Sequence, residues 1–538
     1  MQTSINRVSR LLPWLTGPLL VLAWPTSPAT MVIFFALVPL LWYEQHCKNG
    51  ARFFWVAWAN MLIWNAGTTW WIWNSTGPGA VGAIIANSLL MVFPWMAYRA
   101  TRRRWGHPMG YVAMVLYWLA FEYLHHNWEL SWPWLTLGNV FATHPEWIYW
   151  YSYTGTTGGS LWVWVVNLTI LHTVVGHYAK ASQASHHFTR QAFLRRYAAA
   201  PLLLLPLLLS VVLKPAEPQS ELGHPNVVVV QPNVEAYTEK FTTSPALLLE
   251  QLIKLSASQI DSQTRLLVWP ETAIPAQVWE NKINENPVFT PLWAFLQQHP
   301  QILLVTGIDS YKFYGTENPG GFSIRQMADG TNYEAFNTAM GVTANQPPQL
   351  YHKSKLVPGV ETLPSWLGFM GSLFDGFGGI SGSLGRSSQA SVFQAPGNPY
   401  KAAPVICYES IYSHYTTEYI RRGANILTVI TNDGWWGNTQ GHHQHMHMAR
   451  LRAIENRIWV ARSANTGISC FIAPNGQVLQ PQPWDTEAVI KLEIPTGYTP
   501  TFYGNYGDWM SRLAWPLALL MLAATLAAKW VKLPFIKK

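Results

Sequence analysis

Residues 404–410 read PVICYES, an apolar run that ends at Cys407 and is followed two positions later by Glu409. A short, continuously apolar run is typical of a strand in a sheet that is covered on both faces. Comparable runs occupy residues 226–230, 266–269, 302–308, 338–342, 426–431 and 468–473. Amphipathic helical patterns at 244–260 and 440–458 lie among them. This alternation of strands and helices predicts a layered α/β domain rather than two bare sheets.

Two more polar residues stand at or near the ends of strand-like runs. Glu271 closely follows the run at 266–269, and Lys353 lies in residues 351–356 (YHKSKL). Strand ends are where α/β folds usually place their chemistry. A thiol reacts as its thiolate, a carboxylate can take the thiol proton, and an ammonium group can stabilise both the thiolate and a tetrahedral oxyanion. Glu271, Lys353 and Cys407 therefore suffice for acyl transfer if they converge.

Each of these residues also has a purely structural interpretation when it is taken alone. Cys407 could be a small buried hydrophobic residue, and Glu271 could favour the first turn of a helix. Lys353 could be a solvated residue, and Lys355 lies only two positions away. On a continuous strand both lysines would point to the same face, so this reasoning leaves the choice between them open.

The rest of the chain has the composition of a membrane protein. Of 538 residues 49% are hydrophobic and only 12% are charged, and there are 30 tryptophans. Three cysteines cannot form a disulfide framework. Apolar stretches predict membrane spans at 11–25, 29–45, 53–74, 79–99, 110–127, 161–179, 197–213 and 512–530. We therefore expect a bundle of about eight helices beside the α/β domain, which excludes a fully soluble protein.

The positions of the basic residues predict how the spans are oriented. The short outer loops at 26–28, 75–78 and 128–160 contain no lysine or arginine. The segments on the other side of the spans carry Arg7, Arg10, Lys48, Arg52, Arg99, Arg102, Arg103, Arg104, Lys180, Arg190, Arg195, Arg196, Lys529, Lys532, Lys537 and Lys538. By the positive-inside rule these segments are cytoplasmic. The net charge of +8 therefore reflects topology and does not indicate nucleic-acid binding.

Four blocks carry a family resemblance: residues 267–275 (LVWPETAIP), 351–361 (YHKSKLVPGVE), 404–410 (PVICYES) and 431–437 (TNDGWWG). In this order they resemble the Glu, Lys and Cys blocks of the nitrilase, or carbon–nitrogen hydrolase, superfamily. With the predicted spans, essentially the whole chain resembles the apolipoprotein N-acyltransferase family. The resemblance implies an α-β-β-α sandwich, with Glu271 as base, Lys353 as oxyanion and charge stabiliser and Cys407 as nucleophile. It favours Lys353 over Lys355, because the family's lysine follows Tyr-x and stands three residues before Leu-Val-Pro.

The resemblance also implies further residues around the site. Glu361 stands where the family has another essential glutamate, although the chain reads Pro-Gly-Val-Glu and not Pro-Phe-Gly-Glu. The other positions are Tyr408 and Glu409 after the nucleophile and Phe241 in place of an expected tryptophan. Apart from the resemblance, we expect Asn432, Asp433 and Trp436 to shape the wall of the pocket. The family needs no metal or other cofactor.

The expected organisation has three parts. Residues 1–213 form seven transmembrane spans, residues 214–511 form a periplasmic nitrilase-like catalytic domain, and residues 512–538 form the eighth span and a cytoplasmic tail. The family resemblance implies a multi-pass protein of the inner membrane, and we expect it to be a monomer. Its acyl donor would be a phospholipid and its acceptor the N-terminal diacylglyceryl-cysteine of an apolipoprotein.

Two other functions are compatible with parts of this pattern. A membrane-tethered amidase would use the same three residues with water as acceptor. A transporter or scaffold would show intramembrane ionisable residues, of which Glu122 is the only acid deep in a predicted span.

Two segments remain outside these arguments. His442, His443, His445 and His447 invite a metal interpretation, but the polar start of a helix explains them better, because no carboxylate or cysteine completes a familiar zinc pattern. The glycine- and serine-rich residues 371–398 are expected to form a long loop, either a lid or a slack insertion.

Overall fold

The computed structural model describes residues 11–181, 199–216, 224–235, 238–240, 242–363 and 383–528. The chain divides into two compact units. A helical unit comprises Met1–Trp70, Ala80–Lys214 and Asp508–Lys538, and an α/β unit comprises Trp71–Gly79 and Pro215–Gly507.

Helices occupy the apolar stretches of the helical unit. They are α2 (Thr16–Ala23), α3 (Ile33–Ala36), α4 (Val38–His46), α5 (Gly50–Thr69), α6 (Gly77–Leu90), α7 (Val92–Trp105), α8 (His107–His126), α9 (Tyr151–Ala181), α11 (Ala199–Val212) and α18 (Trp509–Ala527). Within the described residues, two helical stretches are long and apolar enough to cross a membrane, Gly77–Trp105 and Trp509–Ala527. The helices Leu12–Ala23 and Ala199–Val212 are apolar but shorter.

Buried asparagines compensate for irregular backbone inside the helical unit. The helix is interrupted between α3 and α4. There the side chain of Asn167 accepts a hydrogen bond from the Leu37 amide at 3.0 Å and donates one to the Ile33 carbonyl at 2.9 Å. Asn60 bonds the Gly17 amide and the Pro13 carbonyl in the same way, each at 2.8 Å. Backbone groups away from water need such partners, so these residues allow short and broken helices to pack.

The α/β unit contains the following elements in chain order. Its strands are β1 (Asn226–Gln231), β2 (Thr264–Val268), β3 (Ile274–Trp279), β4 (Leu303–Gly315), β5 (Ile324–Gln326), β6 (Asn332–Val342), β7 (Gln349–His352), β8 (Ala402–Ile406), β9 (Ile426–Thr431), β10 (Trp459–Ala464), β11 (Cys470–Ile472), β12 (Val478–Leu479) and β13 (Ala488–Glu493). Its main helices are α12 (Pro245–Ala257), α13 (Thr290–Gln298), α15 (Ser413–Arg421), α16 (Gln440–Asn456) and α17 (Phe502–Tyr506).

The strands form two sheets. The larger has eight strands in the order β13-β1-β2-β4-β6-β5, with β3 paired to β4 and β7 paired to β6. The smaller has five strands in the order β12-β11-β10-β9-β8. Strands β1, β2 and β4 are parallel, as are β8, β9 and β10. A hydrogen bond of 2.7 Å from the Ser463 hydroxyl to the Val230 carbonyl joins the two sheets.

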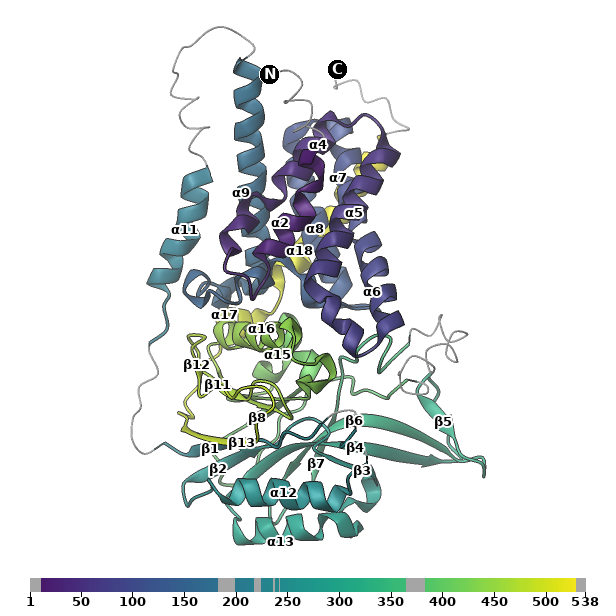
Figure 1. Ribbon diagram of the computed structural model, residues 1–538, viewed down its shortest axis with the longest axis vertical. Coiled ribbons are helices and arrows are strands. Elements are labelled where there is room, and N and C mark those ends of the chain that lie inside the picture. Colours follow the sequence, from purple (N-terminus) through teal and green to yellow (C-terminus); the bar gives the residue numbers. More distant parts are fainter. Residues whose placement is uncertain are drawn as a thin grey trace. The chain divides into compact units, whose positions relative to one another are not determined.

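Helices cover the outer face of each sheet, which gives the expected α-β-β-α order. Helices α12 and α13 lie on the larger sheet, and α15 and α16 lie on the side of the smaller one (Figure 1). Several strand boundaries differ from those expected. Strand β4 continues to Gly315, and β6 begins at Asn332. The sequence did not predict these outer ends, because their polar and aromatic residues interrupt the apolar pattern.

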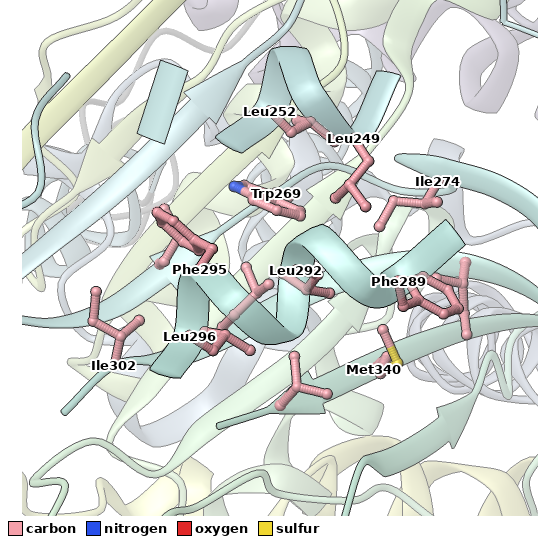
Figure 2. Packing of buried hydrophobic residues seen from close by; sticks show 14 of the residues in the cluster. Leu249, Leu252, Trp269, Ile274, Phe289, Leu292, Phe295, Leu296, Ile302 and Met340 are labelled. Atoms are coloured by element: carbon pink, nitrogen blue, oxygen red, sulfur yellow. The ribbon is translucent and has the colours of Figure 1, made fainter. Parts of the chain in front are cut away.

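The core beneath the larger sheet is packed from both helices and strands. Figure 2 shows Leu249 and Leu252 of α12 together with Leu292, Phe295 and Leu296 of α13 around Trp269. Each such side chain contributes about 1.5–3 kcal/mol when fully buried. The indole nitrogen of Trp269 donates to the Ser256 hydroxyl at 2.9 Å, so its polar atom is also satisfied. This packing fixes the segment that leads from β2 into Glu271.

Two expectations from the sequence fall on residues that the structure does not describe. Phe241 lies outside the described residues, and so do residues 371–382 of the glycine-rich segment. Residues 383–398 are described and form no strand or helix, apart from an isolated bridge between Phe393 and Ala402.

Candidate active site

The topology brings strand ends from both sheets to one region. Glu271 follows β2, and Lys353 follows β7. These two strands run in the same direction, because β4 is parallel to β2, β6 is antiparallel to β4, and β7 is antiparallel to β6. Cys407 comes directly after β8 of the smaller sheet. The three residues predicted from the sequence therefore meet between the sheets, with one contributed by the smaller sheet and two by the larger.

Lys353 forms a buried ion pair with two carboxylates. Its Nζ donates to Glu271 Oε1 at 3.1 Å and to Glu361 Oε1 at 2.9 Å. The side chain of Lys353 is only 1% exposed. Burial alone would lower its pKa, but Glu271 and Glu361 outweigh burial and hold the pKa well above its ordinary value. Lys353 is therefore a fixed positive charge in the site.

Glu271 is held as an ionised acceptor. Asn337 donates to its Oε1 at 2.7 Å, and the backbone amide of Asn432 donates to its Oε2 at 3.1 Å. Burial opposes ionisation, but Lys353 and these hydrogen bonds keep the pKa of Glu271 below its ordinary value. An ionised, positioned carboxylate can accept a proton from a neighbouring thiol.

Cys407 occupies an unusual backbone conformation beside these charges. Its φ is +47°, in the left-handed region that residues other than glycine enter at a cost of about 1–3 kcal/mol. The residue is 6% exposed. Burial and the negative charge of Glu271 raise the pKa of its thiol, whereas Lys353 opposes that rise. The resting sulfur is therefore a thiol within electrostatic range of both Glu271 and Lys353.

Lys353 and Lys355 point to different surroundings, contrary to the expectation that they share a face. Strand β7 ends at His352, so the alternation of a strand does not extend over the two lysines. The Nζ of Lys355 lies 5.3 Å from the ring centre of Tyr412 and 5.2 Å from that of Tyr415. Geometry alone therefore selects Lys353 as the lysine of the charged cluster.

Glu409 joins the ends of the strands that carry Lys353 and Cys407. Its Oε1 accepts hydrogen bonds from the Tyr351 hydroxyl at 2.6 Å and the Ser354 amide at 2.7 Å. Its Oε2 accepts from the Ile406 amide at 2.9 Å. Glu409 is fully buried, and burial raises its pKa. Through these hydrogen bonds Glu409 links the end of β7 to the end of β8.

The remaining expected residues lie in or beside the same region. Glu361 contacts Lys353 directly, and its Oε2 also accepts from the Val357 amide at 2.8 Å. Tyr408 is buried, with its ring 5.3 Å from that of Tyr412. Asn432 contacts Glu271 through its backbone, and Trp436 lies on the short helix that follows it.

Three polar residues of this cluster were not anticipated from the sequence. Lys240 is buried, and its Nζ donates to the Glu271 carbonyl at 3.2 Å. Asn337 bridges Glu271 and Glu361, with its Nδ2 3.0 Å from Glu361 Oε1. Burial raises the pKa of Asp309 to about 6, and Lys240 opposes this rise. Lys240 and Asn337 lie outside the blocks that carry the family resemblance, whereas Asp309 directly follows the apolar run 302–308, a position that could have marked it.

Gly307 on β4 allows the segment around Glu271 to approach the sheet closely. A Cβ on Gly307 would lie 2.3 Å from the Thr272 amide nitrogen and 2.7 Å from the Glu271 Cα. Any larger residue would displace Glu271, because real Cβ atoms do not approach backbone so closely. The Gly307 amide also donates to the Pro270 carbonyl at 3.0 Å.

The histidines of α16 separate into different environments. His443 is exposed, whereas His445 is fully buried and faces Asp433 and Ser410. Over the described part of the chain, no group of three or more His, Cys, Asp or Glu residues could hold a metal ion.

Comparison with known proteins adds to this geometry. Residues 227–501 match the family model described as carbon-nitrogen hydrolase, and residues 16–169 match the apolipoprotein N-acyltransferase N-terminal domain. Proteins named apolipoprotein N-acyltransferase are similar along nearly the whole chain. That of Chlorobaculum tepidum is 29% identical over 95% of this chain and 96% of its own length. That of Geobacter metallireducens is 25% identical over 94% of this chain and 93% of its own length.

Among solved structures, an amidase from Nesterenkonia sp. AN1, with acrylamide added at its active-site cysteine, covers 54% of this chain and 99% of its own. It is 15% identical, with a TM-score of 0.36. The family assignment rests on the sequence matches, which extend over both units. The chain belongs to the carbon–nitrogen hydrolase family, and ahead of its hydrolase domain it carries the N-terminal domain of apolipoprotein N-acyltransferases.

Proposed function

We propose that this protein is an N-acyltransferase that moves an acyl chain from a membrane phospholipid to the N-terminal amine of a diacylglyceryl apolipoprotein. The observation that carries the chemistry is the buried Lys353 ammonium between Glu271 and Glu361, with the Cys407 thiol in range of its charge. The names of its full-length relatives support the class of acceptor.

In the first step, the Cys407 sulfur attacks the ester carbonyl carbon of the phospholipid. Glu271 takes the thiol proton as the carbon–sulfur bond forms, and Lys353 stabilises the negative charge that develops on the carbonyl oxygen. The ester carbon–oxygen bond then breaks. The departing oxygen receives the proton from Glu271, which leaves a lysophospholipid and a thioester on Cys407.

In the second step, the α-amine of the diacylglyceryl-cysteine attacks the thioester carbon. Glu271 takes a proton from the attacking nitrogen, the carbon–sulfur bond breaks, and the proton returns to the sulfur. The products are an N-acylated lipoprotein and the free Cys407 thiol. The same base thus serves both halves of the reaction.

We further propose that the helical unit spans the inner membrane eight times and holds the α/β unit on the periplasmic side. Its helices expose large apolar side chains, including Phe93 at 68%, Leu520 at 67% and Val211 at 72%. Such surfaces suit lipid, and the basic residues assign the cytoplasmic face. Membrane insertion also has a chemical purpose, because extracting a lipid chain into water costs about 0.8 kcal/mol per CH₂.

Glu122 has contacts that argue against a transport pathway. Its Oε1 accepts from the Trp118 indole at 2.9 Å and from the Leu137 amide at 2.8 Å. This acid therefore accepts hydrogen bonds from its own helix α8 and from the backbone of Leu137. The pattern is that of internal packing and not of a relay of ionisable groups.

The proposed function can be tested with purified full-length protein in vesicles that contain a phospholipid labelled in one acyl chain. Label should appear on Cys407 and should leave when a diacylated peptide with a free N-terminal amine is added. Cys407→Ser should carry no acyl label that the added amine can remove. Cys47→Ser, the same exchange in the helical unit, should behave as the wild type. Equally rapid discharge by water would indicate an amidase, and no labelling would contradict acyl transfer.

The proposed topology has its own test. Protease added to spheroplasts should cleave within residues 214–511. The same protease added to inverted membrane vesicles should leave this region intact, and the reverse pattern would overturn the orientation.

A further inference from the structure

Behind the nucleophile lies a charged cluster that the proposed reaction does not use. Asp433, His445 and Arg462 are each 0% exposed, although such residues are rarely fully buried unless they are paired. Arg462 Nη2 donates to Asp433 Oδ1 at 3.0 Å and Oδ2 at 2.8 Å. Burial alone would raise the pKa of Asp433, but Arg462 and His445 hold it well below its ordinary value. Asp433 is thus a fixed anion.

One arm of this cluster ends on the backbone of Cys407. His445 Nε2 lies 3.1 Å from the Cys407 carbonyl oxygen and 2.8 Å from the Ser410 hydroxyl. The Ser410 hydroxyl donates to the same carbonyl at 2.7 Å, so it presents only lone pairs to the imidazole. Nε2 therefore carries a hydrogen, because otherwise it would face lone pairs on both neighbours. The Cys407 carbonyl is held by two donors.

The other arm reaches the sulfur. The Thr431 hydroxyl donates to Asp433 Oδ1 at 3.1 Å, so toward the Cys407 thiol its oxygen can only accept a hydrogen bond. Asp433 thus contacts the nucleophile residue indirectly at both its sulfur and its carbonyl. The same carboxylate is therefore linked to the sulfur side of Cys407 through Thr431 and to its carbonyl through His445.

The orientation of the His445 ring is fixed from two sides. Its Nδ1 lies 3.0 Å from Asp433 Oδ1 and 3.0 Å from Arg462 Nη2. The ring of Trp436 meets it edge to face, with centres 5.2 Å apart and planes at 83°. The imidazole consequently has little freedom to turn away from Cys407.

We propose that His445 is a positioning residue for the nucleophile, oriented by Asp433 and acting through the Cys407 carbonyl. Cys407 has a φ of +47°, a conformation that persists only where the surroundings enforce it. The donors on its carbonyl supply that constraint at the residue itself. Without them the backbone relaxes and the sulfur moves relative to Glu271 and Lys353. The inference rests on the proposed function only in that Cys407 is the nucleophile.

The test compares His445→Ala and His445→Gln in the full-length protein. Two rates are measured: alkylation of Cys407 by iodoacetamide, followed by mass spectrometry of its peptide, and acylation by labelled phospholipid. His445→Ala should slow both rates by about 100-fold with little change in KM, because a displacement of about 1 Å can cost that much. His445→Gln should recover most of the loss, since its amide can donate to the Cys407 carbonyl. His443→Ala, on the exposed face of the same helix, is the matched control and should change neither rate.

The outcomes separate this inference from the proposed function. If the wild type transfers no acyl chain but His445→Ala slows alkylation and His445→Gln restores it, positioning stands and acyl transfer falls. If the wild type transfers acyl chains and His445→Ala is folded with both rates unchanged, positioning is wrong. Should His445→Ala fail to fold, Ser410→Ala removes the other donor and should slow alkylation by about tenfold. Unchanged alkylation in Ser410→Ala and a lack of rescue by Gln would together overturn the inference.

Discussion

The Lys240 ammonium donates a hydrogen bond to the backbone carbonyl of Glu271, with 3.2 Å between the two atoms. This places a second lysine against the residue that we propose as the base. Burial lowers the pKa of Lys240, and the negative charges of Glu271 and Asp309 offset part of that effect.

Lys240→Met should slow acylation of Cys407 by about 10–100-fold, because it removes a positive charge from a buried site where charge is poorly screened. Single-turnover acylation with labelled phospholipid measures the change. Lys254→Met is the control, since Lys254 is exposed on α12. A wild-type rate in Lys240→Met would show that Lys240 serves only to anchor the chain.

The two lysines after β7 should differ sharply in function. Lys353→Met should reduce acylation by about 1,000-fold or more, because it removes the cation that pairs with Glu271 and Glu361. Lys355→Met should cost less than about tenfold, since the Lys355 ammonium packs over two tyrosine rings, a contact worth about 1 kcal/mol. The same labelling assay compares them, and the reverse order of effects would refute the assignment of Lys353.

Glu271 and Glu361 share one lysine, but substitution should affect them unequally. Glu271→Gln should lower acylation by about 10²–10⁴-fold, the usual value of a general base. Glu361→Gln should cost less, because Glu361 moves no proton in the proposed reaction and the Gln amide oxygen can still accept from Lys353, although the acceptor for the Val357 amide is lost. Rates of acylation and of discharge by the amine should both fall in Glu271→Gln. A variant that lost only one of the two steps would mean that another group is the base in the other.

Glu409→Gln should destabilise the fold. The carboxylate accepts from the backbone amides of Ser354 and Ile406, and an amide side chain in the same position would turn an NH₂ group toward a donor. One unsatisfied buried donor costs about 1–3 kcal/mol, so the unfolding midpoint should fall by several degrees. Thermal unfolding in detergent measures it. Glu418→Gln, on the partly exposed side of α15, should leave the midpoint close to that of the wild type.

Alkylation and acylation should depend differently on pH. Burial and Glu271 raise the pKa of the Cys407 thiol above its ordinary value of 9.0, so the thiolate fraction keeps increasing through that pH. Iodoacetamide consumes thiolate, and alkylation should rise by about tenfold per pH unit. In the proposed reaction Glu271 accepts the thiol proton, and Lys353 and Asn337 hold its pKa below its ordinary value, so the acylation rate should stay flat from about pH 6 to 9. Parallel pH profiles would contradict a role for Glu271 in taking the thiol proton.

The buried centre of the α/β unit could be predicted from the sequence because its strands are continuously apolar, as in β1 and β9. Strand β10 could not, because it contains Arg462, whose burial depends on Asp433 from a distant segment. Strand β3 was also missed, since Pro275 and the left-handed Gln277 interrupt its pattern. A local sequence pattern cannot show which distant residue will pair with a buried charge in the folded domain.

The same limit applies to the site. Glu271, Lys353 and Cys407 could be named because each lies in a recognisable block of sequence. Lys240 and Asn337 could not, because an isolated lysine or asparagine ordinarily faces water. Their positions follow from where the two sheets place Glu271, which is a property of the whole domain.

Cys407 follows a strand of the five-stranded sheet, whereas Glu271 and Lys353 follow strands of the eight-stranded one. The proposed reactivity therefore depends on the contact between the two sheets, to which the hydrogen bond from Ser463 to Val230 contributes. A substitution that loosened this contact would separate the sulfhydryl from its proton acceptor, even if each sheet kept its own hydrogen bonds.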